Sequence, residues 1–428
     1  MRIKSDSIAF LALMGALSAL PALSTDMALP ALSSIAATLQ SSVASAALTL
    51  SIFMFGFALA PIAYGPLADS YGRRPVLLAG GVLYTAASLA CALAPSIGVL
   101  LACRLLQGVG AGAGMVLSLT IVRDLFEGSA ARACLSYVAT LRIVAPMIGP
   151  TLGGWVLLAA GWRSIYGVMA LGGAAVTAAV YFGLPETRPH GTVAARDLAS
   201  GAPAAGVPAA GAAAGGTARL RATIGALAGV YRRVLSTPAT VGNALVNALT
   251  FGCQFSYIVG SPLLVMQVLG LSAQTFGLIF ALTAFGIMAA SILNGRLNAR
   301  GVSPHVLLGC GLALSSSTTL IFAAAVFAGF MPLWLLLPVL TLNTFSFGMI
   351  APNASHAAVE PLPEMAGVAS AVVSTMMMGT GAAAGAMVTL LYDGHSARAM
   401  AGMMLVCALA ALSVYVFRVR KTQRPGAS

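Results

Sequence analysis

The sequence predicts an all-α membrane protein with about twelve transmembrane helices in two pseudo-symmetric six-helix bundles. Of its 428 residues, 59% are hydrophobic and only 7% are charged, whereas about a quarter of the residues in soluble domains are charged. No Asp, Glu, Lys or Arg occurs from Val234 to Gly295 or from Gly301 to Val359. Each of these runs accommodates two helices of about 20 residues. The spans are expected to be helical because a bilayer offers backbone groups no hydrogen-bond partners.

Apolar runs, separated by charged residues or by Pro and Gly, define the expected spans in chain order. In the first half they lie near 8–28, 43–64, 76–95, 98–121, 133–158 and 164–184. In the second half they lie near 239–260, 271–294, 304–328, 332–353, 365–391 and 398–417. The centre of the break between the halves contains only Gly, Ala, Pro and Val, a composition typical of a flexible tether. We therefore expect a first bundle over 1–187, a linker over 188–237 and a second bundle over 238–428.

The basic residues predict the orientation of the chain. Arg163 and Arg398 fall between spans on one side of the membrane, Arg104 and Arg142 fall within spans, and every other Lys and Arg falls on the opposite side. Under the positive-inside rule that opposite side is cytoplasmic, and it carries both termini. The net charge of +12 then reflects orientation and contact with anionic lipid, so no nucleic-acid partner is expected. No nucleotide-binding loop, catalytic triad or metal-ligand spacing occurs, so neither an enzyme nor a cofactor is expected.

A charged connector separates the second span from the third. It reads Gly65-Pro-Leu-Ala-Asp69-Ser-Tyr-Gly72-Arg73-Arg74 and is expected to lie at the membrane surface. One interpretation is a solvated charge cluster. The other interpretation is a cytoplasmic latch, with Asp69 capping a neighbouring helix start and Arg73 pairing across the loop. Other charged residues near the ends of the fourth and fifth spans are candidates for the same network: Arg123, Asp124, Glu127 and Arg132.

Asp26 is the one carboxylate expected inside a span. At 1.5 Å per residue it lies about 27 Å along the first helix, and Arg104 lies about 9–10 Å down the fourth from the other side, at a similar depth. A charge at such a depth costs about 2.5–3.5 kcal/mol and needs a cavity or a partner. Burial disfavours a charged carboxylate and a nearby arginine favours it, which suits a group that gains and loses a proton. The alternatives are a hydrated Asp26 at a helix end, and an Arg104 that bonds only to helix ends or to Gln107.

The fifth span contains a kinked, glycine-rich segment that follows the second of the two arginines within spans, Arg142. Proline removes a backbone donor and bends a helix, and glycines four residues apart let another helix approach closely. Arg142 either attracts electronegative groups of a ligand, pairs with Asp26 or has a purely structural role. The residues of the segment are Pro146, Gly149, Pro150, Gly153 and Gly154.

The seventh span carries a polar stripe. Asn243, Asn247, Gln254 and Tyr257 fall within about 80° of one face at 100° per residue. Such a face either lines a central cavity or supplies hydrogen bonds between helices.

Several of these motifs resemble those of one family, the major facilitator superfamily (MFS) of transporters. The connector from Gly65 to Arg74 resembles the family's loop between helices two and three, and this resemblance favours the latch over the solvated cluster. Arg104-Leu-Leu-Gln-Gly-Val-Gly-Ala resembles its fourth-span motif, and Gly149-Pro-Thr-Leu-Gly-Gly resembles the fifth-span motif of its antiporters. Within the family, bicyclomycin-resistance (Bcr/CflA) drug-efflux transporters are the most similar, on several further segments: Ser24-Thr-Asp-Met27, Leu29-Pro-Ala-Leu32, Leu184-Pro-Glu-Thr187, Pro352-Asn-Ala354 and Ala366-Gly-Val-Ala-Ser370.

The resemblance implies a proton-coupled antiporter that exports small drugs or metabolites across a bacterial inner membrane by alternating access. It assigns Arg104 to proton coupling, and it implies the proton gradient as energy source. The expected partners are a small-molecule substrate, protons and membrane lipid, and the expected state is a monomer. A uniporter or symporter for a small metabolite is one alternative, and a membrane sensor or scaffold without transport is another.

Overall fold

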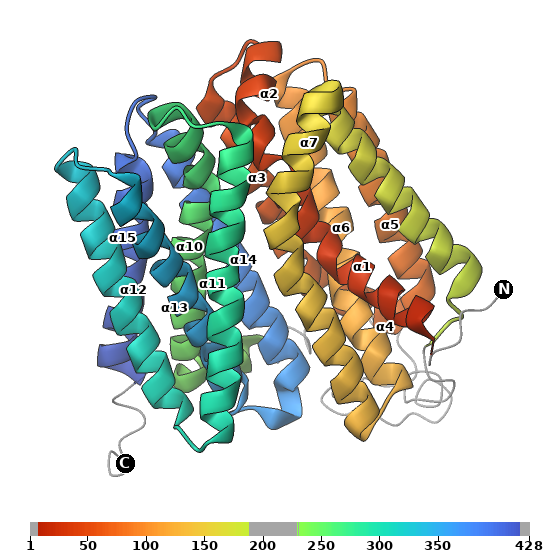
Figure 1. The fold of residues 1–428 in the computed structure, drawn as a ribbon. Coiled ribbons are helices and arrows are strands. Elements are labelled where there is room, and N and C mark those ends of the chain that lie inside the picture. Colours follow the sequence, from red (N-terminus) through yellow and green to blue (C-terminus); the bar gives the residue numbers. More distant parts are fainter. Residues whose placement is uncertain (1–6, 188–228, 230, 420–428) are drawn as a thin grey trace, which may run out of the picture.

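The computed structural model describes residues 7–187, 229 and 231–419. Most of the predicted linker, 188–237, lies outside these residues. The described chain forms two bundles of long helices that stand side by side (Figure 1). The first bundle contains α1 (Ile8–Asp26), η1 (Leu29–Ala31), α2 (Leu32–Thr38), α3 (Val43–Ala58), α4 (Ala60–Tyr71), α5 (Arg73–Ala92), α6 (Ile97–Leu125) and α7 (Gly128–Gly183). The second contains α10 (Pro238–Pro262), η2 (Leu263–Val268), α11 (Ala273–Ala299), α12 (Pro304–Phe327), α13 (Leu333–Val359), η3 (Pro363–Met365), α14 (Ala366–Leu390), α15 (Arg398–Val414) and η4 (Tyr415–Val419).

Eleven helical segments within the described residues are long and apolar enough to cross a membrane. One of them, α7, reverses direction at Gly161, which has a φ of 77°, so its two arms cross separately. A positive φ is strained for residues with a Cβ and is accessible to glycine. The prediction of an all-α membrane protein with about twelve spans is therefore confirmed.

The helices extend beyond several of the predicted spans. After α1 ends at Asp26, helical structure continues through η1 and α2 to Thr38, and α4 reaches Tyr71. The expected connector from Gly65 to Arg74 is therefore helical except at Gly72. Hydropathy marks the part of a helix within the hydrocarbon, whereas backbone hydrogen bonding continues through polar residues at the membrane surface.

The two bundles repeat the same close contacts. In the first, Gly108 of α6 lies against α3, where an added Cβ would fall 2.1 Å from the Phe53 carbonyl oxygen. In the second, Gly348 of α13 lies against α11, where it would fall 2.5 Å from the Ile287 carbonyl oxygen. Small residues at these positions let the backbones meet, which drives helix packing in lipid. The pseudo-symmetric pairs are α3–α6 and α11–α13.

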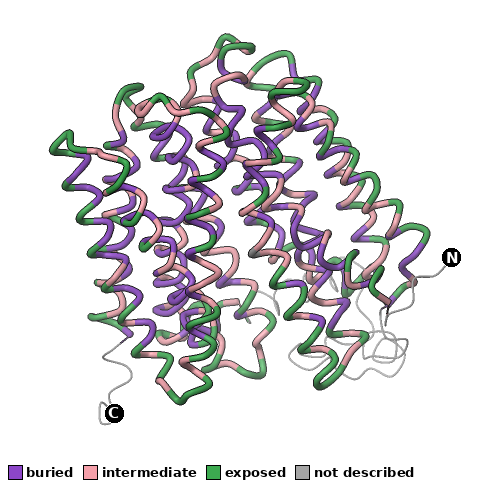
Figure 2. Tube along the Cα trace, in the orientation of Figure 1, coloured by how far each residue is buried: buried purple, intermediate pink, exposed green. Residues whose placement is uncertain are grey.

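Burial follows the same arrangement. Buried residues face the interior of each bundle, and exposed residues line the outer faces of the helices (Figure 2). Many of the exposed residues are large and apolar, such as Leu171, Leu278 and Trp334, each at least 69% exposed. Apolar outer faces of this length fit contact with lipid hydrocarbon.

The bundles contact each other mainly toward one end of the molecule. We call this the α2 end, since α2 lies there at the top of Figure 1. The opposite end, at which Gly72 joins α4 to α5, is the Gly72 end. At the α2 end the Gln267 side chain donates a hydrogen bond of 2.7 Å to the Ser33 hydroxyl. Thr151 of α7 also packs against Gly277 of α11, where an added Cβ would lie 3.2 Å from the threonine hydroxyl.

Candidate functional site

A cavity of about 490 Å³ lies between the two bundles. Pockets that hold drug-sized ligands measure about 300–1,000 Å³. Ala139 of α7, Ser291 of α11 and Ser355 of α13 line it near the Gly72 ends of their helices. The cavity therefore extends from the middle of the molecule toward the Gly72 end, while the α2 end is held together by the contacts above.

Asp26 and Arg142 are the charged residues that line this cavity, and both also line a smaller adjoining cavity of about 170 Å³. Asp26 is the last residue of α1 and is 4% exposed. Neither side chain forms a hydrogen bond or an ion pair with any other residue that the structure describes, so no nitrogen–oxygen distance between them is as short as 4.0 Å. The two opposite charges share one chamber without closing on each other.

Arg104 is fully buried but does not contact the Asp26 carboxylate. Its guanidinium donates to the Ser24 carbonyl at 3.0 Å, to the Gln107 side-chain oxygen at 2.7 Å and to the Thr49 carbonyl at 3.4 Å. It also lies over the Phe53 ring, 4.5 Å from the centroid. The contacts are therefore those of the alternative interpretation: Arg104 bonds to Gln107 and to backbone carbonyls, one of them two residues before Asp26 near the end of α1.

The glycine-rich segment of α7 packs directly on the end of α1. A Cβ added at Gly149 would fall 2.8 Å from the Asp26 Cβ, and one added at Gly153 would fall 2.1 Å from the Met27 carbonyl oxygen. Real Cβ atoms essentially never come this close, so both positions require glycine for the observed approach. Pro146 and Pro150 lie inside the same arm of α7, and Pro146 also lines the cavity.

The polar stripe on α10 divides into two parts. Gln254 and Tyr257 line the cavity, and the Tyr257 hydroxyl is 2.6 Å from that of Thr283. Asn247 lies one layer behind, where it donates to the Ser355 hydroxyl, while Asn243 donates to backbone carbonyls of Ala239 and Ala357. The stripe therefore has both expected roles. Gln254 and Tyr257 line the cavity, whereas Asn243 and Asn247 supply hydrogen bonds between helices.

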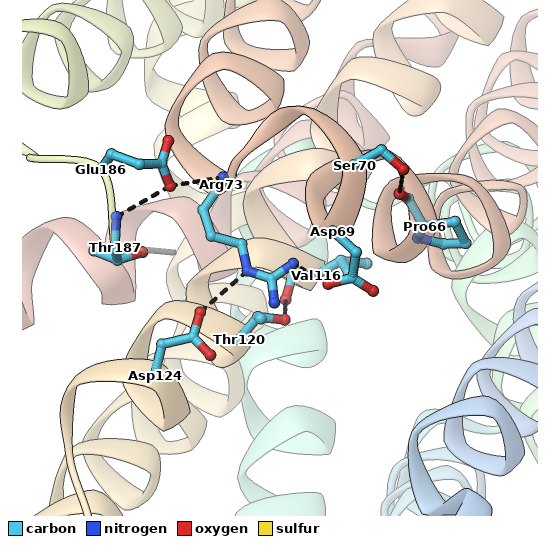
Figure 3. Close-up of polar contacts among 9 residues, drawn as sticks. All are labelled: Pro66, Asp69, Ser70, Arg73, Val116, Thr120, Asp124, Glu186 and Thr187. Atoms are coloured by element: carbon cyan, nitrogen blue, oxygen red, sulfur yellow. Dashed lines mark hydrogen bonds and ion pairs between the residues drawn. The ribbon is translucent and has the colours of Figure 1, made fainter. Parts of the chain in front are cut away.

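A cluster of charges surrounds Arg73 at the Gly72 end (Figure 3). The Arg73 side chain forms ion pairs with Asp69, one turn earlier, and with Asp124 of α6 at 3.0 Å. Arg74 donates to the Tyr181 carbonyl at 2.6 Å and lies over the ring of the same residue. The expected pairing of Arg73 across the loop is thus present, with Asp124 as the distant partner.

Glu186 caps the start of α5. Its two carboxylate oxygens accept from the backbone N–H groups of Arg73 at 2.9 Å and Arg74 at 3.2 Å. The expected capping role of Asp69 is therefore not seen at α5; Asp69 pairs with Arg73 instead. Gly72, at a φ of 99°, leaves room for Glu186, since an added Cβ would lie 2.7 Å from the carboxylate.

Sequence reasoning named Gln107 as a possible partner of Arg104, but it did not assign Glu186 or identify the Ser24 and Thr49 carbonyls that also bind Arg104. Glu186 stood in the segment Leu184 to Thr187, which was noted for its resemblance alone. Thr49 acts through its backbone carbonyl, and a carbonyl has no signal in a sequence because every residue carries one.

Comparisons with known proteins agree with this architecture. The chain matches the family described as the Major Facilitator Superfamily over residues 14–386 and again over 243–427, and it belongs to this family. It is 25% identical to the bicyclomycin resistance protein homolog of Haemophilus influenzae, over 99% of both chains. It is 29% identical to multidrug resistance protein D of Escherichia coli, over 76% of this chain and 74% of the relative.

The fold matches a solved structure as well. A bacterial homolog of the human lysosomal transporter Spinster, in an inward-facing and unoccupied conformation, superposes with a TM-score of 0.69 at 15% identity, over 98% of both chains. The resemblance to MFS drug-efflux proteins that the motifs indicated is confirmed. The chain is a multi-pass membrane transporter of this family.

Proposed function

We propose that the protein is a proton-coupled antiporter that exports small drugs or metabolites by alternating access. Support comes from the names of its relatives, which are resistance proteins, and above all from the position of Asp26. This carboxylate lines a cavity between two bundles and has no partner among the described side chains. An acid of this kind is suited to binding a proton from one side and releasing it to the other.

The packing around Asp26 supports a coupled motion. Gly149 and Gly153 bring α7 against the end of α1, and Arg104 ties the same end of α1 to α3. A change in the charge of Asp26 therefore acts on α7, whose Arg142 and Pro146 line the cavity. Each proton that moves inward across 100 mV would contribute about 2.3 kcal/mol to export.

At the Gly72 end, we propose that the ion pairs of Arg73 and the cap formed by Glu186 brace α4, α5 and α6 as one body. Such a brace lets the bundle move without deforming. The excess of basic residues at this end favours a cytoplasmic Gly72 end in a bacterial inner membrane, with both termini on the same side. We propose that the protein acts as a monomer.

The deciding experiment measures drug accumulation in inverted membrane vesicles, across a panel of antibiotics, with and without an imposed pH gradient. We expect gradient-driven accumulation by the native protein and by Glu364→Gln, which changes an exposed acid in η3. We expect its loss in Asp26→Asn. Accumulation by Asp26→Asn equal to the native level would reject the coupling site.

The remaining outcomes identify the alternatives. Transport that ignores the pH gradient would indicate a uniporter, and cargo movement in the same direction as the protons would indicate a symporter. Purified protein in liposomes that moves no compound under any gradient would favour a sensor or scaffold.

A further inference from the structure

The charges of the cavity are unequally distributed between its walls. Asp26 of α1 and Arg142 of α7 both belong to the first bundle, and the second bundle contributes neutral side chains to the lining. Among these neutral polar groups, Gln254 is 5% exposed and its side-chain oxygen has no hydrogen-bond partner in the described chain. One wall therefore offers an acceptor charge and a donor charge, separated by more than ion-pair distance.

The facing wall is aromatic. Phe251, Tyr257, Phe280 and Phe347 of the second bundle line the cavity, and the Tyr257 and Phe280 rings stack with centroids 5.9 Å apart. Aromatic faces bind flat apolar bodies and place little demand on their exact chemistry. The cavity thus combines a dipolar wall with an aromatic wall.

We propose that the cargo is an aromatic zwitterion, whose cationic donor group binds Asp26 and whose anionic group binds Arg142. This assignment rests on the function proposed above. A cargo with only a cationic group pairs with Asp26 but leaves the Arg142 guanidinium without a partner and repels it. A cargo with only an anionic group pairs with Arg142 but leaves the Asp26 carboxylate without a partner and repels it. An uncompensated charge in a cavity of low dielectric is costly, so the molecule that bridges both is preferred.

The direction of coupling agrees with this cargo. A cationic group and a proton compete for the same carboxylate, so protonation of Asp26 releases the cargo, which is what antiport requires. A purely anionic cargo on Arg142 would instead favour a protonated Asp26 and would produce symport. The other charged or titratable groups around the end of α1 are Arg104, bonded to the Ser24 carbonyl, and the hydroxyl of Tyr84, bonded to Ser24. Tyr257 lies across the cavity, bonded to Thr283.

Four compounds on one aromatic scaffold test the proposal. Tryptophan is the zwitterion, tryptophan amide carries only the cation, N-acetyltryptophan carries only the anion, and N-acetyltryptophan amide carries neither. Binding of each to the purified full-length protein in lipid nanodiscs is measured by titration calorimetry near neutral pH, in two buffers of different ionisation enthalpy. The difference between the binding enthalpies measured in the two buffers gives the number of protons released per molecule bound.

We expect tryptophan to bind about tenfold or more tighter than either singly charged compound, the effect of one charged hydrogen bond. Asp26→Asn should remove the preference for tryptophan over N-acetyltryptophan, together with any proton release. Arg142→Gln should remove the preference for tryptophan over tryptophan amide, and Glu364→Gln should change neither. Tryptophan binding no tighter than the doubly blocked amide, or tightest binding of a singly charged compound, would overturn the proposal.

The native protein alone decides the ranking, so the test stands even where a variant fails to fold. Asp26-dependent drug export with a different ranking would refute the cargo class and leave the antiporter intact. The tryptophan ranking without Asp26-dependent proton exchange would refute the antiporter and leave the binding mode intact.

Discussion

Replacement of Gly153 by alanine tests whether α7 must touch the end of α1. The added Cβ would lie 2.1 Å from the Met27 carbonyl oxygen, about 1.3 Å short of the 3.4 Å at which ordinary contact begins. The obstacle is backbone, which cannot rotate away as a flexible side chain can. The two helices must therefore separate beside Asp26, and overpacking of this kind costs about 1–3 kcal/mol.

Gly154→Ala is the matched control in the same motif. Its Cβ would meet the Ala273 carbonyl oxygen at 3.9 Å, which is ordinary contact, and alanine is favoured over glycine in a helix by up to about 1 kcal/mol. We therefore expect Gly154→Ala to melt at or above the native temperature and Gly153→Ala to melt below it, in thermal unfolding of the purified proteins. Gradient-driven export should fall in Gly153→Ala alone. Equal melting temperatures and equal export in the two variants would refute the packing argument.

Substitutions at three further residues probe other parts of the molecule. Arg104→Gln should lower the melting temperature, since loss of a hydrogen bond from a charged donor costs about 1.5–3 kcal/mol, and Arg104→Lys should restore part of it; a native-like Arg104→Gln would contradict the buried network. Glu186→Ala should cost about 1 kcal/mol by uncapping α5, with a smaller loss in Glu186→Gln, and equal melting of all three proteins would refute the cap. Hydrogen bonds from Ser396 and from the backbone of His395 lower the pKa of Asp393 to about 2, so its stabilising effect is present above the usual 3.8 and is lost as pH falls through about 2. Asp393→Asn should therefore melt below the native protein at pH 6 and converge with it near pH 2; a difference that persists there would show that the carboxylate charge is not the cause.

The charged cluster at the Gly72 end shows which contacts could be predicted from the sequence and which could not. Asp69 and Arg73 lie in the connector after the second span, and Asp124 was a candidate for the same network because the fourth span ends at the same membrane surface; the ion pairs join all three. The assignment of the cap to Asp69 was wrong for α5, where Glu186 accepts from the first backbone N–H groups. Glu186 follows the second arm of α7, and nothing in the local pattern tells which helix start lies beside it.

The buried arginines show a similar division. The cost of a charge in a membrane predicts that Arg104 and Arg142 have partners or a cavity. Which outcome applies to which residue depends on neighbours from other helices. Arg104 meets the backbone of α1 and α3, where its guanidinium donates to the Ser24 and Thr49 carbonyls, although its Nη2 has no hydrogen-bond partner in the described chain. Arg142 faces open space shared with Asp26.

Composition, charge placement and short motifs determined that this chain is a helical transporter with two repeated bundles, because hydrocarbon allows few backbone structures and charges remain at its surfaces. The tertiary structure alone decided that Asp26 shares a cavity with Arg142 and not a hydrogen bond with Arg104. It also decided which glycines touch the acid-bearing helix. These relations depend on the rotation and tilt of helices distant in sequence, which arise from packing between whole bundles and leave no periodic signal in either helix.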